Sequence, residues 1–86
     1  MRKSALAEAA TVRADLASGA ARAARQAAGV SQAEIAREIG VSRSSVCDWE
    51  AGRSGPTVRN ALRYGRTLAG MVRAPEPPAP AEEIVR

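Results

Sequence analysis

The chain is 86 residues long, enough for one small domain, and although 45% of its residues are hydrophobic it contains no Phe, one Trp and one Tyr. A core of this composition must be small and built by close packing around alanine. The formal net charge of +4 favours a polyanionic partner, while the absence of His and the single Cys47 exclude an intramolecular disulfide and a Cys/His zinc site.

Residues 4–28 are rich in strong helix formers, and apolar side chains recur there at steps of three and four residues. We expect helix throughout, with a bend at Ser18 and Gly19, because glycine disfavours a helix interior by about 1 kcal/mol. Two roles are open for residues 1–18. They form either a longer first helix that lies on the domain or a helix that mediates dimerisation or binds a partner.

Residues 32–49 carry the most specific pattern in the chain, two short apolar stripes separated by a tight turn. Ser31 and Glu34 have the spacing of a capping box, Gly40 can close the first helix in the left-handed conformation, and Ser42 can cap the second. The stripes consist of Ile35, Ala36 and Ile39 before the turn and of Val46 and Trp49 after it. Two short helices joined so tightly predict a helix-turn-helix, with its second helix at about residues 43–50.

The remainder of the chain is predicted to form one more helix and a tail. A loop over residues 51–55 leads to Pro56, which suits the first position of a helix, and we expect that helix from Thr57 to about Val72. Prolines in residues 74–80 cannot continue a helix, so residues 74–86 are predicted to be an extended and mobile tail. The tail has three Glu and one Arg, so the chain before it is more basic than the average suggests.

The sequence has no features of a membrane protein, a secreted protein or an enzyme. No apolar run approaches the roughly 20 residues of a membrane span, and the basic start leads into a stretch interrupted by Glu8, Arg13 and Asp15 instead of a signal peptide. No His is available to activate a serine, and no glycine-rich phosphate loop follows a strand. We therefore expect a cytoplasmic protein without catalytic activity, cofactor, metal or small-molecule ligand.

One set of residues matches a known family. The set consists of Arg25, Gly29, Val30, Ser31, Gln32, Glu34, Ile35, Ala36, Ile39, Gly40, Val41, Ser42, Val46, Trp49, Glu50, Gly52, Pro56 and Leu68. Through them, about residues 20–70 resemble the DNA-binding domain of helix-turn-helix regulators of the Cro and phage-repressor type. The resemblance implies an all-α, compact four- to five-helix lambda-repressor-like domain at residues 19–73, with a helical extension at 1–18 and the Pro-rich tail at 74–86.

Many domains of this family continue into a fifth helix that makes the dimer, and the chain departs from that pattern. A proline run stands where that helix would follow, which argues against the usual dimer contact. A homodimer would then use the N-terminal extension at residues 1–18.

The resemblance also implies roles for individual residues outside the second helix of the motif. Arg25 is expected to pair with Glu50 and so to tie the domain's first helix to the end of its third. Gln32, at a helix N-terminus, is expected to anchor a DNA phosphate. Arg53 matches a position that contacts the phosphate backbone, and Arg59, close to the start of the last helix, can also reach DNA.

The helix at about residues 43–50 is the predicted reader of the DNA major groove, which it would enter with its N-terminal end foremost. Arg43 can donate two hydrogen bonds to guanine O6 and N7, while Ser44 can reach a base or the backbone. Ser45 can donate to a phosphate. Two roles are open for Asp48. It can accept a hydrogen bond from cytosine N4, or, since a carboxylate near DNA phosphates is repelled by them, it can instead orient an arginine. Cys47 is expected to be a small, partly exposed side chain.

The sequence therefore predicts a regulator of bacterial or phage origin that binds a specific double-stranded DNA operator and represses transcription, as Cro or a phage immunity repressor does. An alternative is an antitoxin or adaptor module that binds DNA only weakly without a partner protein. An exposed apolar patch along Leu6, Val12 and Leu16 would favour this alternative. A third possibility is a nucleoid protein without sequence preference.

Overall fold

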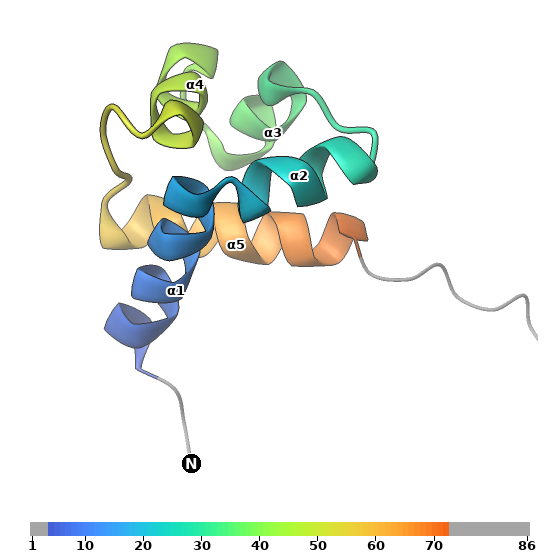
Figure 1. The fold of residues 1–86 in the computed structure, drawn as a ribbon. Coiled ribbons are helices and arrows are strands. Elements are labelled where there is room, and N and C mark those ends of the chain that lie inside the picture. The colour runs from blue at the N-terminus through green and yellow to red at the C-terminus, as the bar shows by residue number, and fades with distance from the viewer. Residues whose placement is uncertain (1–3, 73–86) are drawn as a thin grey trace, which may run out of the picture.

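The computed structural model describes residues 4–72, and this part of the chain is entirely helical. Its helices are α1 (Ala5–Ser18), α2 (Ala20–Ala27), α3 (Gln32–Ile39), α4 (Arg43–Ala51) and α5 (Val58–Val72) (Figure 1). The expected all-α, four- to five-helix fold is confirmed. The predicted tail at residues 74–86 lies outside the described residues. The domain boundaries predicted between residues 18 and 19 and between residues 73 and 74 stay predictions.

The segment expected to be one bent helix is two helices, separated by Gly19. Gly19 has a φ of 90°, in the left-handed region, and its N–H donates to the Leu16 carbonyl at 3.3 Å. Only glycine adopts this conformation readily, so the helix is interrupted where a bend was predicted. The interruption is a break between two helices and not a bend within one. The chain then turns and begins α2 in a new direction (Figure 1).

Helices α3 and α4 form the predicted helix-turn-helix, and local capping fixes their ends. Ser31 Oγ accepts from the Glu34 N–H at 3.0 Å, and Glu34 Oε1 accepts from the Ser31 N–H at 2.8 Å, which completes the capping box. Gly40 ends α3 with a φ of 80°, and Ser42 Oγ accepts from the Ser45 N–H at 3.1 Å at the start of α4.

The start of α5 differs from the prediction by a small shift. Thr57 Oγ1 accepts from the Asn60 N–H at 3.1 Å, so Thr57 caps the helix and α5 begins at Val58. The expectation that Pro56 takes the first helical position is therefore wrong. Pro56 instead lies buried just before the cap.

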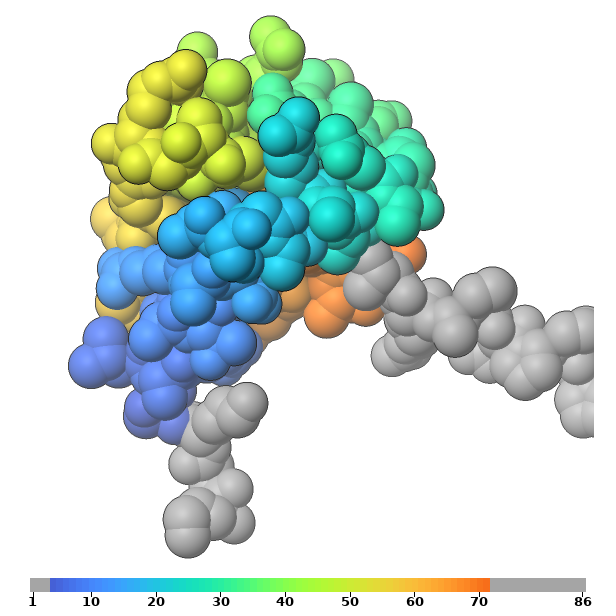
Figure 2. Space-filling view, viewed as in Figure 1, coloured from blue at the N-terminus to red at the C-terminus, as the bar shows by residue number. Residues whose placement is uncertain are grey.

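The core lies where α5 crosses beneath the other helices (Figure 1). Ile35, Val46 and Tyr64 are each 0% exposed, and Trp49 meets Tyr64 edge-to-face with ring centroids 6.4 Å apart. The other buried members of the cluster are Leu16, Ala21, Ala36, Ile39 and Leu68. The two helices of the motif thus turn their inner faces to the core, and they form one end of the molecule (Figures 1 and 2).

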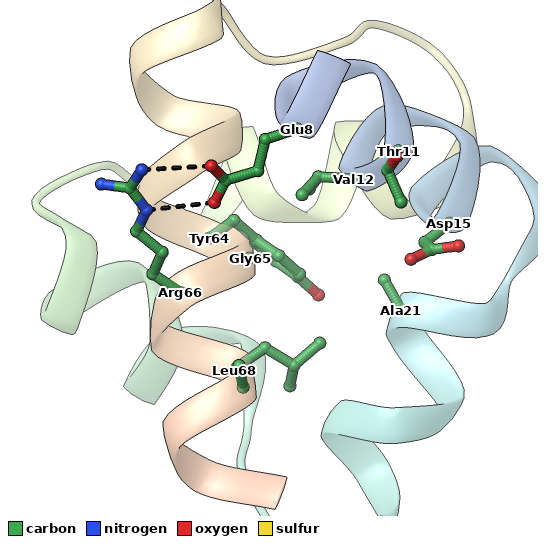
Figure 3. A pocket seen from close by; sticks show the side chains of 10 residues that line it. Glu8, Thr11, Val12, Asp15, Ala21, Tyr64, Gly65, Arg66 and Leu68 are labelled. Carbon is green, nitrogen blue, oxygen red and sulfur yellow. Dashed lines mark hydrogen bonds and ion pairs between the residues drawn. The ribbon is translucent and has the colours of Figure 1, made fainter. Parts of the chain in front are cut away.

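Helix α1 lies on α5, as the first of its two expected roles requires. Ala9 and Leu16 of α1 are buried, and Val12 packs so closely on Gly65 that a Cβ there would lie 2.5 Å from Val12 Cγ2. Glu8 accepts two hydrogen bonds from Arg66, each of 3.1 Å, at the edge of the same contact (Figure 3). A cleft of about 410 Å³ remains between the helices, lined by Val12, Ala21, Tyr64 and Leu68 among others (Figure 3).

Candidate nucleic-acid interface

Helix α4 has one buried face and one polar face. Val46 is 0% exposed and Trp49 6%, so both point into the core. Arg43 and Ser44, in the first turn, are exposed and have no side-chain hydrogen bond or ion pair among residues 4–72. The helix therefore presents an arginine and a hydroxyl at its N-terminal end, where the backbone N–H groups and the helix dipole also favour an anion.

Ser45 is more restrained than Ser44. It is half-buried, and its hydroxyl lies 3.0 Å from the hydroxyl of Ser42, the residue that caps α4. A phosphate bound by Ser45 would share this hydroxyl with the cap. The hydrogen bond to Ser42 thus fixes the position from which the Ser45 hydroxyl could contact a phosphate.

Asp48 is paired with an arginine, which agrees with one of the two roles considered for it. Arg53 Nη1 lies 3.0 Å from Asp48 Oδ1, and the Arg53 backbone N–H donates to the Asp48 carbonyl at 2.9 Å. Hydrogen bonding to Asp48 is the main cause of the raised pKa of Arg53. Both side chains are exposed, so the pair is screened by water and can be exchanged for a contact with DNA.

Arg25 and Glu50 form a buried fork at the opposite end of α4. Arg25 Nε donates to Glu50 Oε2 at 2.7 Å and Arg25 Nη2 donates to Oε1 at 2.8 Å. Arg25 Nη1 also donates to the Val30 carbonyl at 2.6 Å, which fixes the chain between α2 and α3. Arg25 is 5% exposed, so this ion pair holds α2, the following turn and α4 together as one unit.

Two further side chains complete the coordination of Glu50, and the sequence analysis missed both contacts. Tyr64 Oη donates to Glu50 Oε2 at 2.8 Å, and Gln32 Nε2 donates to Glu50 Oε1 at 3.1 Å. A tyrosine within the apolar stripe of α5 was a usable signal, because a buried phenol needs a hydrogen-bond partner. The Gln32 amide, expected to anchor a phosphate, gives one N–H to this network and keeps the other.

The network sets the protonation states of its members. Burial tends to raise the pKa of Glu50, but hydrogen bonds from Arg25, Gln32 and Tyr64 outweigh it, and the pKa is lowered. The Glu50 hydrogen bond raises the pKa of Arg25. Burial, together with the hydrogen bond to Glu50, raises the pKa of Tyr64. Glu50 is thus held ionised and Tyr64 neutral, so the phenol remains a donor.

Further exposed arginines lie on the elements before and after α4 in the chain. Arg59 is exposed in the first turn of α5, and Arg53 follows α4 directly. A hollow of about 180 Å³ next to α4 is lined by Arg22 and Gln32, with Cys47, Glu50 and Ala51 completing it. Arg22, which is exposed on α2, was not singled out from the sequence, because its position beside Gln32 depends on how α2 packs against the motif.

Residues 4–72 contain no group of three or more His, Cys, Asp or Glu side chains that could hold a metal ion. Within the same residues, every helix is too short or too polar to cross a membrane.

The fold and the exposed polar face of α4 define a helix-turn-helix domain of the DNA-binding class. A family model described as helix-turn-helix, the Cro/C1 type, matches residues 22–69, which is more than half of the chain. The chain therefore belongs to this family, which is a family of DNA-binding regulatory domains. Searches among curated proteins and among solved structures gave no match.

Proposed function

We propose that the protein is a sequence-specific regulator that occupies a double-stranded DNA operator and represses transcription, in the manner of Cro or a phage immunity repressor. The observation that supports this most directly is the first turn of α4, where Arg43 and Ser44 are exposed and unpaired among the described residues. Family membership and the net charge of +4 support the choice of DNA. The proposed place of action is the cytoplasm of a bacterium or an infected host.

In this proposal α4 enters the major groove with its N-terminal end. Arg43 donates to guanine O6 and N7, and Ser44 contacts a base or the backbone. Asp48 accepts from cytosine N4 after exchanging Arg53 for the base. The contacts to the phosphate backbone come from Gln32, Ser45, Arg53 and Arg59.

We further propose that two copies associate through α1. Leu6 is 63% exposed and is the exposed large hydrophobic residue of the described chain, with Ala5, Ala7 and Ala10 exposed near it. Sedimentation at increasing protein concentration should show a dimer that Leu6→Lys disrupts. A monomer at all concentrations would contradict the proposal. The adaptor alternative loses its expected support, because Leu16 is 2% exposed and Val12 packs against the core.

The experiment that tests the function is a binding selection against randomised duplexes at near-physiological salt. Enrichment of a palindrome would support a specific regulator that binds as a symmetric dimer, and a single half-site would support binding as a monomer. Binding without enrichment that depends only on salt would contradict specific recognition and favour a nucleoid role.

Two arginine variants then separate base reading from backbone contact. Arg43→Ala should weaken operator binding by about 1–3 kcal/mol and relax the preference at one base pair. Arg53→Ala should weaken all sequences alike and lower the slope of log K against log salt by about 0.9. If Arg53→Ala abolished binding to one operator and spared random DNA, the two roles would be wrongly assigned.

A further inference from the structure

Arg13 connects α1 to the segment that follows α4, the helix proposed to enter the DNA groove. Its Nε donates to the Pro56 carbonyl at 3.0 Å, across 43 positions of sequence. Pro56 belongs to the segment 52–57 between α4 and α5, which we call the 52–57 loop and which contains Arg53. Within residues 4–72, no other hydrogen bond reaches this loop from outside α4 and α5.

Apart from Arg13, hydrogen bonds hold the 52–57 loop only where it joins α4 and α5. Near α4, the Gly52 N–H donates to the Trp49 carbonyl at 3.2 Å and the Arg53 N–H donates to the Asp48 carbonyl at 2.9 Å. Ser54 and Gly55 are exposed and make no hydrogen bond among the described residues. At the α5 end, Thr57 Oγ1 accepts from the Asn60 N–H at 3.1 Å. Within residues 4–72, Arg13 therefore adds the hydrogen bond that ties this loop to an element other than α4 and α5.

Part of the space between α1 and the loop is open to solvent. An open pocket of about 300 Å³ lies between α1 and the loop, lined by Arg13, Leu16, Trp49 and Pro56 among others. Pro56 itself is buried, whereas Ser54 and Gly55 are exposed, so the directed bond to the Pro56 carbonyl adds to packing in fixing where the loop lies. The donor is half-buried, so water competes with it less than at an open surface.

We propose that Arg13 is a positioning residue of the DNA interface, which orders the 52–57 loop in advance so that Arg53 meets a phosphate at a lower entropic cost. A loop already in its bound conformation loses less freedom on binding, and the affinity rises accordingly. This inference rests on the proposed function, in which Arg53 contacts the DNA backbone. It extends the interface to α1, which lies outside the residues that the family model matches.

The test uses two variants that each remove one positive charge and one polar tie of α1. Arg13→Met deletes the donor to Pro56 and keeps an aliphatic stem over the cavity, whereas Arg66→Met deletes the pair with Glu8 and leaves the loop untouched (Figure 3). On the selected operator, Arg13→Met should lose about threefold to tenfold in affinity, the equivalent of one hydrogen bond. Arg66→Met should change affinity by less than about twofold, and Arg13→Lys should restore part of the loss.

A double-mutant cycle shows whether Arg13 acts through the loop. In the Arg53→Ala background the effect of Arg13→Met should largely disappear, because the ordered loop then has no phosphate contact to support. Equal losses in both backgrounds would mean that Arg13 acts on DNA by itself or through overall charge, and would overturn the proposal.

A second readout needs no DNA. In the free protein, NMR order parameters of the Ser54 and Gly55 amides should fall in Arg13→Met and stay unchanged in Arg66→Met. Unchanged order in Arg13→Met would overturn the proposal whatever the affinities are. If the wild type selects no operator but the loop still loosens in Arg13→Met, the proposed function is wrong and the DNA role of Arg13 falls with it, while its ordering of the loop stands.

Discussion

Glu50 and Asp48 lie two residues apart on α4, and each forms an ion pair with an arginine, but their surroundings differ. The Glu50 side chain is 2% exposed and accepts hydrogen bonds from Arg25, Gln32 and Tyr64. The Asp48 side chain is 45% exposed and accepts from Arg53, whose own side chain is 66% exposed. An arginine–carboxylate ion pair is therefore buried in one case and exposed to water in the other.

The difference shows that burial decides what an ion pair does. Removing one partner of a buried pair leaves a charge without compensation, at a cost of about 3–5 kcal/mol, whereas an exposed pair contributes about 0–1 kcal/mol. The Glu50 network can thus hold α2, α3, α4 and α5 in place. The Asp48 pair is weak enough to open, as the proposed exchange of Arg53 for a DNA contact requires.

The largest expected effect is the loss of Glu50. Glu50→Ala should lower the free energy of unfolding by about 3–5 kcal/mol, because Arg25, Tyr64 and Gln32 all lose their acceptor. Asp48→Ala is the matched control and should cost no more than about 1 kcal/mol. Urea denaturation of both variants measures the contrast, and equal costs would refute the comparison.

Acid should also weaken the Glu50 network, since protonation removes the charge of the Glu50 side chain and leaves the side chain in place. The pKa of Glu50 is lowered from its ordinary 4.5, so its contribution to stability is present above about pH 4.5 and is lost as pH falls through the lowered value. The pKa of Glu34 is also lowered, because its carboxylate accepts a hydrogen bond from the Ser31 N–H. Glu50→Gln should therefore be less stable than the wild type at neutral pH, and the gap should narrow in acid. A gap that is constant with pH would contradict this.

Tyr64→Phe should have an intermediate effect. It removes one hydrogen bond to a buried carboxylate, worth about 1.5–3 kcal/mol, and keeps the ring against Trp49. The pKa of Tyr64 is raised above its ordinary 10, so the stability it contributes is full below pH 10 and is lost as pH rises through the raised value. Denaturation at neutral and alkaline pH should show this alkaline loss in the wild type and not in Tyr64→Phe.

The smallest effect on folding is expected for Asp48→Asn, which weakens the exposed pair without changing shape. Unfolding should change by less than about 1 kcal/mol. Arg53 loses its competing carboxylate, so binding to random DNA should tighten, and fluorescence anisotropy at several salt concentrations would measure it. The gain should vanish when Arg53→Ala is added. Tightening that persists without Arg53 would indicate general charge repulsion by Asp48.

The helix-turn-helix was predictable because its signals are local. Ser31, Glu34, Gly40 and Ser42 set the ends of α3 and α4 through bonds to residues at most four positions away, and the structure places those ends as expected. The Arg25 and Glu50 pair was expected only through the family resemblance, since 25 positions separate the two residues. The DNA contacts assigned to Arg43, Ser44, Arg53 and Arg59 stay predictions.

By itself, the sequence determined the ends of the two helices of the motif, which faces are apolar and that the domain is of the helix-turn-helix type, because capping and periodicity act within a few residues. Only the tertiary structure decided that the amide of Gln32 and the phenol of Tyr64 meet at Glu50, and that Arg13 reaches Pro56. These contacts depend on the angles at which helices cross, and those angles result from the packing of the whole core.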